Sequence, residues 1–474
     1  MMNGAIFVLD IGKTLSKISL WTRDGVLVDR ASRPNLGGAQ ISQAGGPYPA
    51  LDVTGIGEWL ISQLAQFARK AEIHHIVPIA HGAALAILRE DQLALPPMDY
   101  EAKIPADVLE RYRAGRDPFA QNGSPALPDG LNLGAQLHWL EEQNPGCLDG
   151  ATWLPWPQYW AWFLSGEARA EVSALGCHTD LWSPARDDFS PMAKKKGWAA
   201  KLAPIAFAGA PIGTLRPDLA RQTGIAPDAK IYCGIHDSNA ALIAARGFAG
   251  LDQSEATILS TGTWFVAMRV RKSGALIPVL APGRDCLVNV DAWRQACPSA
   301  RWMGGREIAL AIGEPGLAID LPEHQASLHE AAATVLEQGM IPMPSFVPGC
   351  GPFPDHATNW QTNPQNIPND PILRAACACL YAALVTDVSL DLIGSRNRIL
   401  VEGRFARADL FVRALAALRP KDQILVASAD YDASFGGLRL VFPELKPLGS
   451  LRRRSPLELD LQSFRTRWRA LVDR

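Results

Sequence analysis

The sequence predicts an α/β protein built from two domains of similar design. Its 474 residues exceed the roughly 100–200 residues of one typical domain. Residues 5–28 are expected to form a strand, a polar glycine-containing turn, a second strand and the start of a third. Residues 256–270 repeat the order of strand, small polar turn and strand. Because the two patterns lie in opposite halves of the chain, we expect one domain over residues 1–245 and a second over residues 246–474.

Hydrophobic patterning gives the elements of each domain in order. Apolar runs and polar–apolar alternation predict strands in the first domain over residues 5–9, 17–21, 26–28, 76–80 and 231–235. Helices are expected there over about residues 57–71, 131–144 and 240–245. In the second domain we expect strands over residues 256–260, 264–270 and 398–401, and helices over residues 372–393 and 408–417.

Two stretches of the first domain lack a clear period. Residues 95–129 are rich in proline and are expected to form a loop region. Residues 153–164 are rich in tryptophan and run into Ser165 and Gly166, which are typical of a helix end. Two interpretations of the tryptophans stay open: a helix face packed in the core, or a platform on which a sugar ring stacks.

Composition excludes several classes of function. The formal net charge is −2, so the charge of the sequence does not indicate nucleic acid or a membrane surface as a partner. No signal peptide is expected, and no run is seen to approach the ~20 apolar residues of a membrane helix. The eight cysteines are scattered, and the closest pair, Cys377 and Cys379, fits no zinc or redox motif. We expect reduced thiols in a cytoplasmic protein.

The first turn has the residues needed to hold a phosphate and a metal ion. Gly12 lets the backbone approach a phosphate closely, and Thr14 can donate a hydroxyl hydrogen bond. Lys13 or Lys17 can add positive charge. Asp10 can hold Mg²⁺ directly or through water. Taken alone, this pattern is more often an ordinary turn.

The second turn, at Thr261, Gly262 and Thr263, offers the same chemistry. It also lies between two predicted strands, and this paired occurrence is what favours phosphate binding over an ordinary turn. Phosphoryl transfer needs little more than donors around the phosphates, a divalent metal and a base near the acceptor hydroxyl.

Two further polar sites follow buried strands. Asp237 lies between such a strand and a predicted helix, at the end of the strand where open α/β sheets bind ligands. It could accept a proton from an attacking hydroxyl, or it could simply cap the helix. His236 is either a substrate contact or a core histidine. His81 and Gly82 follow the strand at residues 76–80, and either line a sugar pocket or form an ordinary turn.

These elements, in this order, resemble the FGGY family of carbohydrate kinases. The most specific matches are D-I-G-K-T at residues 10–14, G-I-H-D at residues 234–237 and S-T-G-T-W at residues 260–264. Further segments look like pieces of the same family, at residues 173–182, 399–403 and 433–437. The resemblance therefore covers nearly the whole chain.

The resemblance implies the two-domain actin-like ATPase (ribonuclease H-like) fold, with an ATP cleft between the domains. It implies a kinase that uses ATP and Mg²⁺, with sugar bound mainly by the first domain and nucleotide by the second. Asp237 would be the catalytic base and Asp10 the metal ligand. The implied ATP contacts are Gly12, Lys13, Thr14, Lys17, Thr261, Gly262, Thr263 and Gly403. The implied sugar contacts are His81, Gly82, His236 and Asp237. A homodimer remains open.

Some positions depart from the family pattern. Lys13 replaces a smaller residue, E-G-R at residues 402–404 replaces a glycine pair, and G-G-L-R at residues 436–439 replaces Gly-Ala-Ala. The last two changes leave the adenine contacts in question.

The sequence around the two turns also bears on the substrate and on rival functions. G-T-W at residues 262–264 and the sequence at residues 30–35 look closest to L-fuculokinases, and next to rhamnulokinases. The expected substrate is therefore a ketose such as L-fuculose or L-rhamnulose, phosphorylated at its terminal hydroxyl. The alternatives are a catalytically degenerate regulator that binds sugar or nucleotide, and another ATPase of the same fold.

Overall fold

The computed structural model describes residues 2–36, 48–251, 254–272, 277–314, 316–340, 342–356, 368–428 and 431–472. The chain divides into two compact units. The first comprises Met1–Ala249, Val288–Ala296 and Tyr431–Pro447, and the second Gly250–Leu287, Cys297–Asp430 and Leu448–Arg474. The sequence predicts two uninterrupted domains that meet between residues 245 and 246, whereas the first unit also includes two short segments from the second half of the chain.

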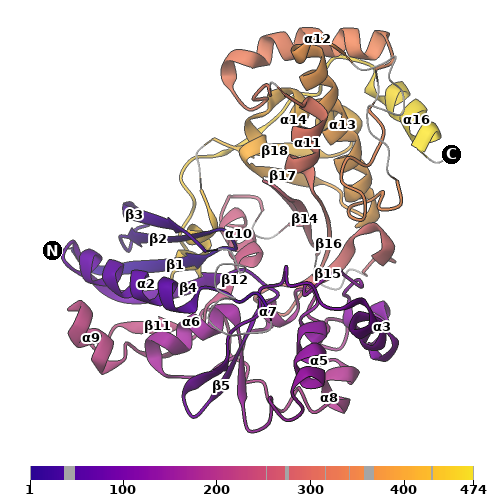
Figure 1. Ribbon diagram of the computed structural model, residues 1–474. Helices are drawn as coiled ribbons and strands as arrows, with labels where there is room; N and C mark the ends of the chain where they lie inside the picture. The colour runs from indigo at the N-terminus through magenta and orange to yellow at the C-terminus, as the bar shows by residue number, and fades with distance from the viewer. Residues whose placement is uncertain are drawn as a thin grey trace. The chain divides into compact units, whose positions relative to one another are not determined.

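A mixed sheet forms the centre of the first unit (Figure 1). Its strand order is β10-β11-β4-β1-β2-β3, with β12 also paired to β4. The three strands β1, β2 and β3 form an antiparallel meander, and β4 runs parallel to β1. The strands are β1 Met2–Ile11, β2 Leu15–Trp21, β3 Leu27–Pro34, β4 Ala71–Ala80, β10 Pro211–Thr214, β11 Lys230–Tyr232 and β12 Ile235–His236.

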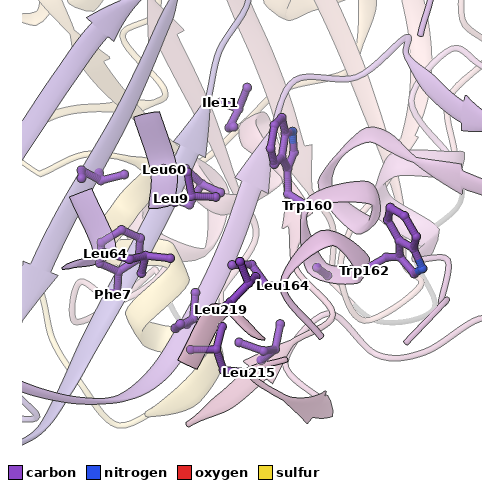
Figure 2. Close-up of a cluster of buried hydrophobic side chains, with 14 of the residues drawn as sticks. Phe7, Leu9, Ile11, Leu60, Leu64, Trp160, Trp162, Leu164, Leu215 and Leu219 are labelled. Atoms are coloured by element: carbon purple, nitrogen blue, oxygen red, sulfur yellow. The ribbon is translucent and has the colours of Figure 1, made fainter. Parts of the chain in front are cut away.

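Helices cover both faces of this sheet because β1 is apolar on both sides. Successive side chains of a strand point to opposite faces. Phe7 and Leu9 therefore join one core, which includes residues of α2 (Val53–Ala68), α6 (Trp156–Ser165) and α9 (Pro217–Thr223) (Figure 2). Ile6 and Val8 join the opposite core, with α10 (Asp237–Ala245) and α15 (Ala433–Val441).

The tryptophan-rich segment is packed inside the protein. It forms β7 (Thr152–Pro155) and then α6, and Trp153, Trp156 and Trp160 are fully buried. Trp160 lies in the core shown in Figure 2. The packed-face interpretation therefore describes these three rings, and they are not a stacking platform on the surface.

The residues between β4 and β10 add a second layer of small elements around their own core. The proline-rich stretch was wrongly expected to be loop only, since it contains α3 and α4. Pro105 and Pro118 precede these helices, where a missing N–H costs nothing. The added elements are β5 Leu85–Arg89, β6 Gln92–Leu95, α3 Ala106–Gly115, α4 Phe119–Asn122, α5 Leu133–Gln143, α7 Val172–Leu175, β8 Trp182–Ser183, β9 Asp188–Phe189 and α8 Pro191–Lys195.

The second unit repeats the arrangement of the first. Its sheet order is β15-β16-β14-β13-β17-β18-β19, in which β14 is antiparallel and β17 parallel to β13. The strands are β13 Ala256–Thr261, β14 Phe265–Val270, β15 Cys286–Val290, β16 Ala296–Trp302, β17 Arg398–Gly403, β18 Gln423–Ala427 and β19 Leu451–Arg453. The helices are α11 Gly304–Ile312, α12 Gln325–Glu337, α13 Pro371–Leu392, α14 Asp409–Leu418 and α16 Leu461–Val472, with 3-10 turns at Pro282–Arg284, Pro322–His324 and Arg404–Arg407.

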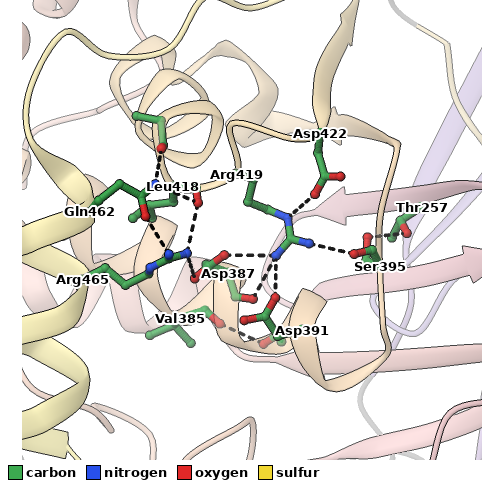
Figure 3. Close-up of polar contacts among 12 residues, drawn as sticks. Thr257, Val385, Asp387, Asp391, Ser395, Leu418, Arg419, Asp422, Gln462 and Arg465 are labelled. Atoms are coloured by element: carbon green, nitrogen blue, oxygen red, sulfur yellow. Dashed lines mark hydrogen bonds and ion pairs between the residues drawn. The ribbon is translucent and has the colours of Figure 1, made fainter.

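Helix α13 is the central helix of this unit. It is long and apolar enough to cross a membrane by length and composition, contrary to the expectation that no run comes close, but 89% of its most apolar window is buried inside the protein. Near the end of α13, Arg419, which directly follows α14, donates hydrogen bonds to Asp387 (3.0 Å), Asp391 (2.8 Å) and Asp422 (2.7 Å) (Figure 3). Such a satisfied buried network fixes how α13 and α14 pack.

Candidate functional site

The turn between β1 and β2 is tight and is fastened by one side chain. The Gly12 amide donates to the Leu15 carbonyl at 3.1 Å, and a Cβ on Gly12 would lie 2.9 Å from that oxygen. Asn35 donates through Nδ2 to the Gly12 carbonyl (2.8 Å) and through its backbone N–H to the Thr14 carbonyl (2.9 Å). It also accepts from the Ser16 hydroxyl at 2.7 Å. Sequence reasoning singled out residues 30–35 only for their resemblance to L-fuculokinases and missed this role of Asn35.

Asp10 lies near the end of β1, opposite Lys17 of β2, with Lys17 Nζ 4.0 Å from Asp10 Oδ2. Burial raises the pKa of Asp10 to about 7, and the carboxylates of Asp237 and Asp432 add to the rise while Lys17 opposes it. Two further acidic side chains therefore act on Asp10. Asp432, which caps α15, was not among the predicted site residues.

The donor set around Asp10 fits Mg²⁺ better than a cation that needs an all-protein cage. Among the described residues, no group of three His, Cys, Asp or Glu side chains is arranged to hold a metal ion. Magnesium commonly takes one or two carboxylates together with water and substrate phosphates. A hollow of about 270 Å³ opens beside Asp10 and is also lined by Lys17, Arg30, Ser32 and Asp432. Asp10 could hold such an ion there, and the ion would offset the carboxylate repulsion.

Asp237 is the first residue of α10, directly after β12, which runs parallel to β4. Its Oδ1 accepts from the Ser238 backbone N–H (2.6 Å) and hydroxyl (3.2 Å), and His236 Nε2 lies 3.2 Å from the same oxygen. Among the described residues, Oδ2 receives no hydrogen bond. The Asp237 side chain is 35% exposed, so one oxygen is anchored and the other is free to accept a proton.

His81 follows β4 and is nearly buried. Its Nδ1 donates to the Gly82 carbonyl at 2.7 Å, which leaves Nε2 as the acceptor. Burial lowers the pKa of His81, so the ring is neutral at pH 7. Its ring packs edge-on against Tyr100, with centroids 5.6 Å apart. A neutral imidazole is suited to a hydrogen bond with a sugar hydroxyl.

Gly82 leaves room for two other side chains. A Cβ there would lie 3.0 Å from His236 Nε2 and 3.6 Å from Cys177 Sγ. His236 is 6% exposed, so it lies behind Asp237 rather than at the surface. The structure thus brings Gly82, Asp237 and His236 together, and adds Cys177, which sequence reasoning did not single out.

Lys13 is engaged in an ion pair. Its ammonium contacts Asp99, lies 3.5 Å from Glu101 Oε2, and sits 4.8 Å from the centroid of the Tyr100 ring. Its charge is therefore already shared with two carboxylates, and its contact with ATP stays a prediction.

The second glycine turn is described within its own unit. The Thr261 hydroxyl donates to the Glu402 carbonyl (2.5 Å) and accepts from the Phe405 N–H (3.1 Å), so it already has partners within the protein. The Gly305 N–H at the start of α11 donates to the Thr263 carbonyl at 3.2 Å. A Cβ on Gly305 would overlap the Gly262 carbonyl oxygen. Close packing therefore holds this turn against α11, with Gly262 at its tip.

Gly403 ends β17 and has a backbone conformation that only glycine adopts readily, with φ 81° and ψ −164°. A Cβ there would overlap the Thr261 carbonyl oxygen. Gly436 and Gly437 lie in α15 of the first unit, where Gly436 touches the backbone of α10 at Ala240. Gly436 thus allows α10 and α15 to pack closely against each other.

Two sheets of one design, each with a glycine turn between its first two strands, define the actin-like ATPase fold. A crystal structure of a carbohydrate kinase from Novosphingobium aromaticivorans superimposes with a TM-score of 0.92 and 50% identity, over 100% of this chain and 99% of that one. Residues 253–447 match the family model described as "Carbohydrate kinase FGGY, C-terminal domain". The chain belongs to the FGGY family of carbohydrate kinases.

Two further proteins are similar to this chain. L-fuculokinase from Salmonella typhi is 28% identical over 302 residues, which are 60% of this chain and 61% of that protein. The matched region thus spans about six-tenths of that relative. Gluconate kinase from Lactobacillus acidophilus has a TM-score of 0.81 at 14% identity, over 99% of this chain and 98% of that one, which shows the shared fold.

Proposed function

We propose that this protein transfers the γ-phosphoryl group of ATP to a hydroxyl of a sugar, with Asp237 as the general base. The observation that carries the proposal is the state of the Asp237 carboxylate. One of its oxygens is anchored by the start of α10 and by His236, while the other has no hydrogen bond among the described residues. A base held in this way can take the proton of the attacking hydroxyl without first having to reorient.

The other predicted residues take roles that agree with their surroundings. Asp10 would hold Mg²⁺, which would supply charge stabilisation at the phosphates. The backbone of the turns at Gly12 and Gly262 would approach the phosphates. Thr14, Lys17 and Thr263 would add contacts to ATP. His81 would accept a hydrogen bond from a sugar hydroxyl through Nε2, since its ring is neutral and its one N–H donates to the Gly82 carbonyl.

The proposed substrate is a ketose such as L-fuculose or L-rhamnulose, phosphorylated at its terminal hydroxyl. The support is the L-fuculokinase from Salmonella typhi, together with the G-T-W motif at residues 262–264. The proposed location is the cytoplasm, because all eight cysteines are free thiols.

The test is ADP release from ATP·Mg²⁺ across a panel of ketoses, aldoses and sugar acids. One sugar should give strong turnover, and Asp237→Asn should lower kcat by about 10²–10⁴, the usual contribution of a general base. Asp228→Asn is the matched control, because Asp228 is an exposed aspartate of the same unit. Turnover that survives in Asp237→Asn would exclude Asp237 as the base. Stabilisation by a sugar without any turnover would favour the non-catalytic binding protein instead.

A further inference from the structure

His236 and Asp237 are neighbours in sequence but lie in different surroundings. Both stand at the junction of β12 and α10, where His236 caps the helix and Asp237 begins it. The His236 side chain is 6% exposed and the Asp237 side chain 35%. The backbone N–H of His236 also donates to the Ser173 hydroxyl at 3.3 Å. The imidazole is thus fixed inside the protein, with only the carboxylate reaching the open side.

The imidazole contacts the carboxylate oxygen that does no chemistry in the proposed reaction. His236 Nε2 lies 3.2 Å from Oδ1 of Asp237, the oxygen that also accepts from Ser238. Gly82 lies beside the same edge of the ring, and a Cβ there would come 3.0 Å from His236 Nε2 and 3.6 Å from Cys177 Sγ, so the absence of a side chain at Gly82 leaves room for both. The Cys177 thiol and the Asp237 carboxylate therefore both interact with the ring.

We propose that His236, held in place by Cys177, is a positioning residue that fixes the rotamer of Asp237 and leaves Oδ2 facing the substrate. The inference rests on the proposed function, in which Asp237 is the base. It assigns no direct sugar contact to His236, in contrast to the expectation from the sequence.

The charged groups around the ring support this role. Burial opposes a charge on His236, but Cys177, Asp237 and Glu171 outweigh it and raise the pKa of the imidazole. Burial likewise resists ionisation of Cys177, but His178 and His236 outweigh it and lower the pKa of the thiol. Asp10 of β1 and His81 at the end of β4 face Asp237, and Asp432, which directly precedes α15, acts on Asp10. A protonated ring donates a hydrogen bond from Nε2 to Oδ1 of Asp237.

One nitrogen of the His236 ring, Nδ1, does not take part in these contacts. Among the described residues, His236 Nδ1 is buried and has no hydrogen-bond partner, and the same is true of Glu171 Oε1. Glu171 reaches the neighbourhood through Ser173, whose hydroxyl contacts both Glu171 and the His236 backbone. The contacts at the Nε2 edge thus orient the ring, while Nδ1 is not needed for that role.

The kinetic test compares kcat and KM of His236→Gln and His236→Leu, with the sugar that gives turnover as the substrate. Glutamine keeps an N–H donor toward Asp237, whereas leucine keeps only bulk. We expect His236→Leu to lower kcat by roughly 10- to 100-fold, with KM for sugar and for ATP changed less than about threefold. His236→Gln should recover most of kcat, and the acidic limb of its kcat/KM profile should move to higher pH because the positive charge is lost. A large rise in KM for sugar in both variants would show direct sugar contact and overturn the proposal.

A second measurement does not depend on turnover. The protein has nine histidines, so ¹³C-histidine NMR can follow the His236 ring, with His236→Gln identifying its signal. The ring should titrate at least one pH unit lower in Cys177→Ala and in Asp237→Asn than in the wild type. An unchanged titration in both variants would overturn the proposed contacts. If the wild type shows no turnover with any sugar while this titration shifts, the kinase assignment fails and the positioning contacts stand.

Discussion

Replacing Gly403 by alanine tests whether this glycine is required by packing rather than by a nucleotide. The residue combines two conditions that exclude a side chain. Its φ of 81° and ψ of −164° lie in a region open essentially to glycine alone, at a cost of about 1–3 kcal/mol for other residues. A Cβ would also overlap the Thr261 carbonyl oxygen, far inside the 3.0 Å that real Cβ contacts respect.

Both costs arise from the same added Cβ, so their sum, about 2–6 kcal/mol, is an upper range. Forced overlap in a packed interior costs about 1–3 kcal/mol, so Gly403→Ala should destabilise the second unit by about 4 kcal/mol. For a unit of 150–250 residues, each kcal/mol lowers Tm by roughly 2–4 °C. The expected loss is therefore on the order of 10 °C.

Gly339→Ala is the matched control in the same unit. Gly339 also has a positive φ, 64°, but a Cβ there would meet no atom within 4 Å. It should cost only the backbone term, about 1–2 kcal/mol.

The assay is urea and thermal unfolding of the wild type and both variants, with KM for ATP measured in parallel. A Gly403→Ala protein as stable as Gly339→Ala would refute the packing argument. If its KM for ATP were then greatly raised, the glycine would instead be needed beside the nucleotide.

Two other predictions concern the first unit. Gly436→Ala would drive a Cβ into the Ala240 carbonyl of α10, so urea unfolding should show that the free energy of unfolding falls by about 1–3 kcal/mol or more. In the control Gly115→Ala the new Cβ meets no atom within 4 Å, so the free energy of unfolding should change by less than about 1 kcal/mol. Equal effects of the two substitutions would contradict the close contact of α10 and α15. Burial raises the pKa of Glu171 to about 7, so its contribution to stability is present below about pH 4.5 and is lost as pH rises through 7. Glu171→Gln should remove this loss of stability with rising pH, which is on the order of 3 kcal/mol. If the Tm of the variant still decreased in parallel with that of the wild type between pH 5 and 8, the prediction would be contradicted.

The secondary structure was readable from the sequence where apolar runs were long. Both hairpins, the parallel strand beside each and helix α13 lie within a few residues of their expected positions. The strand expected over residues 231–235 is split into β11 and β12, because Gly234 adopts φ 84° to pass close to the Pro78 carbonyl. That contact comes from a residue far away in sequence, so no local pattern could have indicated it.

Only those site residues that lie in short local motifs could be predicted from the sequence. Asp10, Gly12 and Asp237 lie at or just beyond strand ends, within the short motifs at residues 10–14 and 234–237, and these local features singled them out. Asp432 and Cys177 reach the same region from distant parts of the chain. Cys177 lies in the segment 173–182, but nothing in that segment indicated a role for its thiol. The pairing of Lys13 with Asp99 likewise depends on a loop whose course the sequence does not specify.

Helix α15 has a consequence for how the chain is made. Its side chains Phe435 and Leu438 cover Val8 and Ile79 of the first sheet, although they are encoded after nearly the whole second unit. As the chain leaves the ribosome, that face of the first sheet stays without its cover until residues 433–441 emerge. A fragment that stops at residue 249 would expose this apolar face permanently and should aggregate. The two units are therefore expected to depend on a single complete chain, and separate expression of the first one requires that α15 be supplied with it.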